Sequence, residues 1–199
     1  LALASPDNAV WSQDLAVALH FHALLAQQLG QDEVALDALQ RSCQMLQADQ
    51  RRDPENREYQ RAYPVCLAAK ASVLLSMQRQ LPARIAAQES LAELNRLIGV
   101  AGAQSDWPVQ RALSSLRLAE IEQAAGDCAA AQSAIGQFDR LPQEHQGSIL
   151  RTHKVRRQLL NARCAMQQRN NQAAHAAYQA AVENLGPIDE RSSVQMLAL

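Results

Sequence analysis

A seven-residue motif occurs twice in this chain, and the second copy begins 48 residues after the first. It reads SPDNAVW at 5–11 and DPENREY at 53–59. Both copies contain proline, an acidic residue and asparagine in succession, with an aromatic residue three positions later. Each copy is followed by two segments of helical periodicity, so the surrounding residues repeat as well. Self-similarity at such a period is typical of a helical array, in which each unit buries its apolar face only by stacking on its neighbours.

Apolar residues recur at helical spacing through the chain, and turn-forming residues interrupt them at regular intervals. This pattern predicts four helical hairpins, with turns near Gly30, Arg79, Gly126 and Arg169. The stretch at 98–108 is expected to be a loop. The first hairpin is expected to pair a helix from the first motif to Gly30 with one from Asp32 to Arg52. The second pairs helices at 57–79 and 82–97, and the third pairs a helix at 107–125 with one from 128 onward. The fourth pairs helices at 148–168 and 171–185.

Local signals mark several helix boundaries. Asn8, Asn56 and Asp127 precede expected helices. Each is suited to cap its helix, because a short polar side chain accepts a hydrogen bond from a backbone N–H that the first turn leaves unpaired. Pro64 falls near the first turns of the helix at 57–79, where we expect a mild kink or a later helix start.

The composition narrows the class of protein. Hydrophobic residues make up 48% of the chain but aromatic residues only 4%, and the abundant Ala, Leu and Gln are good helix formers. The formal net charge is -1, whereas nucleic-acid-binding domains are usually basic, so we expect no nucleic-acid partner. No run of about 20 apolar residues is present, so we expect no membrane insertion of this segment. The opening LALASPDN lacks methionine and reads like the end of a helix, which favours a fragment of a longer protein.

The sequence contains no recognisable catalytic, cofactor-binding or metal-binding motif, and we expect a chain that is not an enzyme. His20 and His22 are the nearest approach to a metal pair, but two residues on a helix diverge by about 200° around its axis. Metal-binding pairs on helices are three or four residues apart. There is no glycine-rich phosphate loop and no serine-centred nucleophile motif. An enzyme whose site lies between repeats is the alternative that we consider least favoured.

Small residues at fixed distances from the hairpin turns resemble those of tetratricopeptide repeats. The first hairpin carries Ala23, Ala35 and Ser42 at the three small-residue positions of that motif. The fourth carries Ala162, Ala174 and Ala181 with the aromatic Tyr178, and the third carries Ala119 and Ala131 but Phe138 at the last position. With Arg79 taken as its turn, the second hairpin reads Ser72, Arg84 and Leu91, and is the weakest match.

The units are longer than the usual repeat of about 34 residues. In this they resemble the repeats that follow bacterial serine/threonine kinase domains and membrane-bound winged-helix regulators. The resemblance implies an all-α, right-handed superhelical solenoid of about four antiparallel hairpins. We expect 1–199 to form one helical-repeat domain, with units at about 5–52, 53–101, 105–141 and 145–185 and a C-terminal cap at 186–199.

In the repeats that this chain resembles, outward positions of the first helices bind peptides in a concave groove. Transferring those positions one by one gives a mixed groove that is basic toward its C-terminal end, and an acidic or carboxylate-ended peptide is the expected ligand. The alternative for each residue is ordinary solvated surface. The predicted groove residues are His20, Phe21, Leu24, Lys70, Arg117, Glu120, Arg156 and Arg163.

The four cysteines suggest two disulfides. Cys43 lies eleven residues before Pro54 and Cys66 twelve after it, so each lies roughly 17 Å from the turn of an antiparallel helix pair. Cys128 and Cys164 fall at repeat positions that tend to meet in the family that the chain resembles. Two such bonds would indicate an oxidising compartment, and we expect the bacterial periplasm. The alternative is four buried cysteines that act as small apolar residues.

Two functional hypotheses follow, and both are non-catalytic. The first is a protein- or peptide-binding sensor, the periplasmic region of a bacterial signalling protein such as a serine/threonine kinase, in which binding alters the groove or a homodimer. The second is a cytoplasmic scaffold or transcription-regulator domain that docks a partner protein and keeps its cysteines reduced. The thiol state separates the two.

Overall fold

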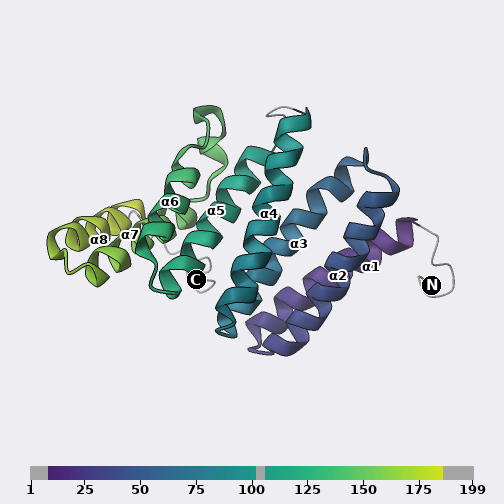
Figure 1. The fold of residues 1–199 in the computed structure, drawn as a ribbon, viewed down its shortest axis with the longest axis horizontal. Coiled ribbons are helices and arrows are strands. Elements are labelled where there is room, and N and C mark those ends of the chain that lie inside the picture. Colours follow the sequence, from purple (N-terminus) through teal and green to yellow (C-terminus); the bar gives the residue numbers. More distant parts are fainter. Residues whose placement is uncertain (1–8, 102–105, 186–199) are drawn as a thin grey trace.

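The computed structural model describes residues 9–101 and 106–185, which fold into eight α-helices and one 3-10 helix without any strand (Figure 1). The all-α prediction is therefore confirmed for this part of the chain. The predicted cap at 186–199 and the predicted helix cap Asn8 lie outside the described residues. The elements are α1 (Ala9–Gln28), α2 (Asp32–Arg52), α3 (Arg57–Ser76), α4 (Gln80–Ala101), α5 (Trp107–Ala124), α6 (Cys128–Asp139), η1 (Gln143–Ser148), α7 (Arg151–Gln167) and α8 (Asn171–Leu185).

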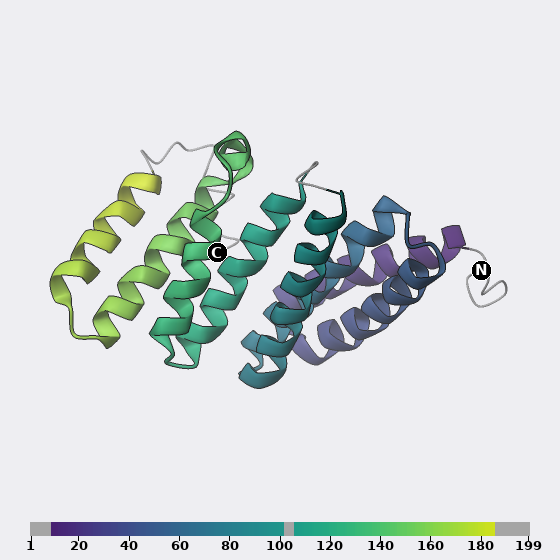
Figure 2. The same ribbon diagram turned by 45° about the horizontal axis from the view of Figure 1, so that its top comes forward.

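The helices form four successive antiparallel hairpins, and each helix packs on the next along the chain (Figures 1 and 2). Among the first helices of the hairpins, α3 also touches α5 and α5 touches α7. The second helices, α2, α4, α6 and α8, do not make such contacts among the described residues beyond the weakest ones. The helices α3, α5 and α7 therefore lie closer together than the second helices do and share one side of the array.

Several helix boundaries differ from those expected. The helix α3 ends at Ser76 rather than 79, and α4 begins at Gln80, two residues before Pro82. The residues at 98–101, expected in a loop, continue α4. The fourth hairpin begins at Arg151 because η1 occupies the segment before it. Pro64 lies buried inside α3, which starts at Arg57, so a later helix start was wrong.

Two of the predicted helix caps are confirmed. The Asn56 side chain accepts a hydrogen bond from the backbone N–H of Glu58 at 3.1 Å. Asp127 Oδ1 accepts one from the backbone N–H of Ala130 at 2.9 Å. Each bond satisfies one of the amide groups that the first turn of a helix leaves unpaired.

The hairpin turns fix the register of the repeat. The residue at each turn has a left-handed backbone, with φ of 71° at Gly30, 58° at Gln78, 83° at Gly126 and 57° at Arg169. The turn of the second hairpin is thus Gln78, and the assignment to Arg79 was wrong by one residue. With Gln78 as the turn, successive turns are 48, 48 and 43 residues apart.

The corrected register makes the second hairpin equivalent to the first. Its three small-residue positions become Ala71, Ala83 and Ser90, in place of Ser72, Arg84 and Leu91. All three have no exposed surface. Their first-hairpin counterparts, 48 residues earlier, are Ala23, Ala35 and Ser42, which are 1%, 0% and 0% exposed.

The two buried serines make the same contact in both hairpins. Ser42 Oγ donates to the carbonyl oxygen of Ala16 at 2.8 Å, and Ser90 Oγ donates to that of Pro64 at 2.8 Å. In each case a hydroxyl of the second helix reaches the backbone of the first. This contact requires the two helices to approach closely, which the surrounding alanines permit.

Candidate functional site

Two adjoining recesses run over the first helices of the four hairpins. The larger has a volume of about 1,030 Å³ and takes side chains from α1, α3, α5 and α7. The smaller, of about 290 Å³, is lined by the same four helices. We call the surface that these two recesses form the groove. The residues that line both of its parts are Leu24, Gln27, Ser72, Arg117, Glu120 and Arg156.

The floor of the groove carries a cluster of charges. Glu120 accepts hydrogen bonds from Arg117 Nη1 at 2.5 Å and from Arg156 Nε at 2.8 Å. The side chains of Arg117, Glu120 and Arg156 are 15% to 29% exposed to solvent. Arg163 lies exposed on the larger part of the groove and has no ion-pair partner among the described residues. Three guanidinium groups therefore share the larger recess with one carboxylate, which leaves the C-terminal half of the groove positively charged.

Burial shapes the ionisation of the groove. It lowers the pKa of Arg117, an effect that Glu120 opposes and Arg156 reinforces; arginine nevertheless stays protonated at neutral pH. Burial also lowers the pKa of His153, and Arg156 and Arg117 lower it further. His153 Nδ1 is buried without a hydrogen-bond partner in the part of the chain that the structure describes. His20, which also lines the smaller recess, likewise has its pKa lowered by burial.

The structure brings together six of the eight residues predicted to line a groove, namely His20, Leu24, Arg117, Glu120, Arg156 and Arg163. Phe21 is 61% exposed and lines neither recess, although its ring meets that of His20 edge-on with centroids 6.2 Å apart. Lys70 lies in a different recess. Lys70 was wrongly predicted to line the groove because the register of the second hairpin was shifted by one residue. A shift of one residue along a helix changes the direction of the side chain by about 100° around the helix axis.

The corrected register also identifies groove residues that sequence reasoning missed. Ser72 lies 48 residues after Leu24 and 48 before Glu120, and Arg163 follows Glu120 by 43. All four line the larger recess. The offset between the two copies of the heptapeptide was the signal that could have found Ser72. Gln27 and His153 were missed too, and no motif marks them.

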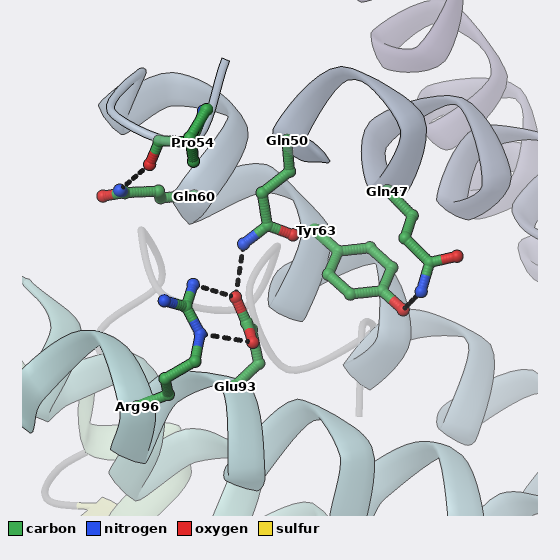
Figure 3. Close-up of polar contacts among 7 residues, drawn as sticks. All are labelled: Gln47, Gln50, Pro54, Gln60, Tyr63, Glu93 and Arg96. Carbon is green, nitrogen blue, oxygen red and sulfur yellow. Dashed lines mark hydrogen bonds and ion pairs between the residues drawn. The ribbon is translucent and has the colours of Figure 1, made fainter. Parts of the chain in front are cut away.

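Lys70 belongs to a second recess, formed by α2, α3 and α4 and about 600 Å³ in volume. Figure 3 shows the polar contacts beside this α2–α4 recess. Gln47 donates to the Tyr63 hydroxyl at 2.9 Å, and Glu93 is held by Arg96 at 2.6 Å and by Gln50 (Figure 3). Hydrogen bonds from Arg96 are the main cause of the lowered pKa of Glu93.

Charges in the α2–α4 recess balance. Two cations, Lys70 and Arg96, are matched there by Glu89 and Glu93. The groove, in contrast, has an excess of positive charge. Of the two surfaces, the groove is therefore the better suited to attract a charged ligand.

The cysteine predictions are half right. Cys43 and Cys66 lie at disulfide distance, with their sulfur atoms 2.26 Å and their Cα atoms 5.6 Å apart, and join α2 to α3. Cys128 and Cys164 are free, so the prediction of a second disulfide was wrong.

The free thiols of Cys128 and Cys164 are buried next to Ala131. Cys128 Sγ contacts the side-chain oxygen of Gln167 at 2.6 Å, so this thiol has a hydrogen-bonding partner in place of a bond to Cys164. Burial and the Cys128 thiol raise the pKa of Cys164 to about 12. This pair thus behaves as buried small side chains, the alternative considered from the sequence.

In residues 9–101 and 106–185, no group of three or more His, Cys, Asp or Glu side chains is placed to hold a metal ion. None of the described helices is both long and apolar enough to cross a membrane. No family model, no curated protein and no solved structure matches the chain. Function is therefore inferred from the geometry and charge of the groove.

Proposed function

We propose that this chain is a non-catalytic binding module whose groove takes an acidic peptide segment, or a C-terminal carboxylate, of a partner protein. The full array is a right-handed superhelical solenoid in this proposal, with the first helices on its concave side. The single observation that carries the proposal is the excess of guanidinium over carboxylate in the groove, where Arg117 and Arg156 pair with Glu120 and Arg163 lines the same recess.

The chemistry of arginine supports a carboxylate ligand. A guanidinium group presents paired N–H donors that match the two oxygens of a carboxylate. Arg117 and Arg156 are held in place by Glu120, so little side-chain freedom is lost when a ligand binds there. Arg163 has no such restraint and is free to form a new ion pair. Because these contacts are electrostatic, the affinity should fall as the salt concentration rises.

A pair of charge reversals tests the site. Arg163→Glu removes a positive charge from the groove, and Lys70→Glu makes the same change in the α2–α4 recess. Labelled acidic peptides with free and amidated C-termini would be titrated by fluorescence anisotropy. We expect Arg163→Glu to weaken binding by at least about tenfold, equivalent to about 1.4 kcal/mol. Lys70→Glu should leave the affinity within about twofold, since Lys70 lines neither part of the groove.

Equal losses in the two variants would contradict the proposal, because they would indicate attraction to the protein's overall charge rather than to the groove. Binding that is insensitive to both reversals would contradict it as well. Comparison of the free and amidated peptides then separates recognition of a terminal carboxylate from recognition of acidic side chains.

The proposed setting is the periplasmic sensor region of a bacterial signalling protein, such as a serine/threonine kinase, in which occupation of the groove is relayed to the rest of the protein. The disulfide-distance pair Cys43 and Cys66 favours this setting over the second candidate, a cytoplasmic scaffold or regulator domain. Thiol trapping of the protein in cells distinguishes them. Two blocked cysteines support the first, and four reactive thiols support the second.

A further inference from the structure

The first helix of the array exposes an apolar residue whose counterparts deeper in the array are buried. Leu25 in α1 is 60% exposed. The residues 48 and 96 positions later, Val73 in α3 and Ile121 in α5, are 1% and 0% exposed. Both counterparts belong to the core cluster that joins α3 to α2 and α5 to α4. The face of α1 that carries Leu25 is therefore of the kind that, elsewhere in this chain, is covered by a preceding second helix.

The last helix shows the complementary feature. Tyr178 and Val182 in α8 are 39% and 67% exposed. The counterparts of Tyr178 in α2, α4 and α6 are Leu39, Ala87 and Ile135, which are at most 3% exposed. Those of Val182 include Cys43, which is joined to Cys66 of α3, and Asp139, which pairs with Arg157 of α7. Both partners, Cys66 and Arg157, lie on the first helix of the next hairpin. The exposed face of α8 is thus the face that α2, α4 and α6 turn toward the next hairpin.

A polar contact recurs at all three junctions inside the array. It joins the residue two positions after one turn to the residue two positions before the next turn. The three contacts are Ser76 Oγ to Asp32 Oδ2 at 2.9 Å, Gln80 Nε2 to the carbonyl oxygen of Ala124 at 3.1 Å, and Cys128 Sγ to Gln167 Oε1 at 2.6 Å.

The same positions at the two ends of the array are Asn171 in α8 and Gln28 in α1. Both side chains are amides, and an amide supplies both a donor and an acceptor to its partner. Neither carries a charge, so nothing at this position opposes contact between the two ends.

We infer that copies of this chain associate head to tail, with α8 of one copy packed on α1 of the next. Tyr178 and Val182 would cover the face that carries Leu25, and Asn171 would contact Gln28. The second copy is the occupant because α8 and α1 are the two halves of a junction that the chain already forms three times. Such a contact joins different surfaces, so it leaves an end free and builds chains rather than closed dimers. The inference does not depend on the groove or on its ligand.

Two single substitutions and their mixture test this arrangement in the full chain. Leu25→Glu places a charge on the α1 face, and Val182→Glu places one on the α8 face. Both side chains are more than half exposed, so the folded monomer should be retained, as circular dichroism checks. We expect sedimentation velocity to show a mass that grows with concentration for the unsubstituted chain and a monomer for each variant. An equimolar mixture of the two variants should form a dimer and nothing larger, because each retains one competent face.

Three results would overturn the inference. One is an unsubstituted chain that stays monomeric up to about 100 µM. Another is association of Val182→Glu alone, which would indicate a symmetric contact between two α1 helices. The third is a mixture of the two variants that remains monomeric.

Discussion

The link between Cys43 and Cys66 should contribute measurably to stability. The two residues are 23 positions apart, and a cross-link that closes a loop of this size lowers the entropy of the unfolded chain. The loop-closure relation gives about 3.4 kcal/mol at 25 °C for this loop. That value is a substantial share of the 5–15 kcal/mol that is typical of the total stability of a folded domain. Reduction should therefore move the unfolding midpoint of the first two hairpins well below that of the oxidised chain.

The assay is equilibrium unfolding in urea, followed by circular dichroism, with and without a reductant. A Cys43→Ala/Cys66→Ala chain serves as the matched control, because reductant should leave its midpoint unchanged. Thiol titration in denaturant without reductant should count two thiols, those of Cys128 and Cys164. Four thiols, or a loss of less than about 1 kcal/mol on reduction, would refute the reasoning, since the loop relation predicts a larger effect.

Three further predictions concern the turns, the buried serines and the groove. Gln78→Gly and Arg169→Gly should each stabilise the chain to urea by about 0.5–1 kcal/mol, because both positions have a left-handed backbone that glycine adopts without strain; a loss of stability would contradict the assigned turns. Ser42→Ala and Ser90→Ala should each cost about 1 kcal/mol in the same assay through loss of a buried hydrogen bond, and no measurable cost would contradict the equivalence of the two hairpins. Burial lowers the pKa of His153, so its contribution to stability is lost as the pH falls below about 6.5, the value in the unfolded chain. An acidic ligand favours the protonated ring, so peptide affinity measured by anisotropy should rise over the same fall in pH, and His153→Gln should reduce the rise.

Short-range signals in the sequence were sufficient for the helical class and for two of the helix caps. Asn56 and Asp127 cap their helices as expected because a cap depends only on residues within one turn. Pro64 was harder to interpret, since a proline inside a helix is normally unfavourable. It is accommodated inside α3, where it is buried and its carbonyl oxygen accepts a hydrogen bond from Ser90 of the next helix.

The turn of the second hairpin could not be located from the local sequence. A glutamine gives no sign that its backbone is left-handed, so the turn was placed at Arg79 rather than Gln78. Because of that shift of one residue, the residue predicted to line the groove in the second hairpin was Lys70, which lies in the α2–α4 recess instead. The offset of 48 residues, already present in the repeated heptapeptide, would have given the correct register.

The charges of the groove could be predicted only in part. Glu120 and Arg156 were both expected to line it, but their ion pair joins residues 36 positions apart. Such a pair depends on how α5 and α7 pack, which no local pattern encodes. The same holds for Cys128 and Cys164, whose repeat positions bring them together without determining whether they bond.

The central claim is that an acidic peptide binds in the groove formed by the first helices. The most direct test is an NMR titration of the isotope-labelled chain with such a peptide. We predict that the amide signals that shift will cluster on the groove, around Leu24, Ser72, Glu120 and Arg163, while signals of Gln44 and Glu89 beside the α2–α4 recess stay unchanged. Shifts confined to the α2–α4 recess, or scattered over the surface without clustering on the first helices, would contradict the claim.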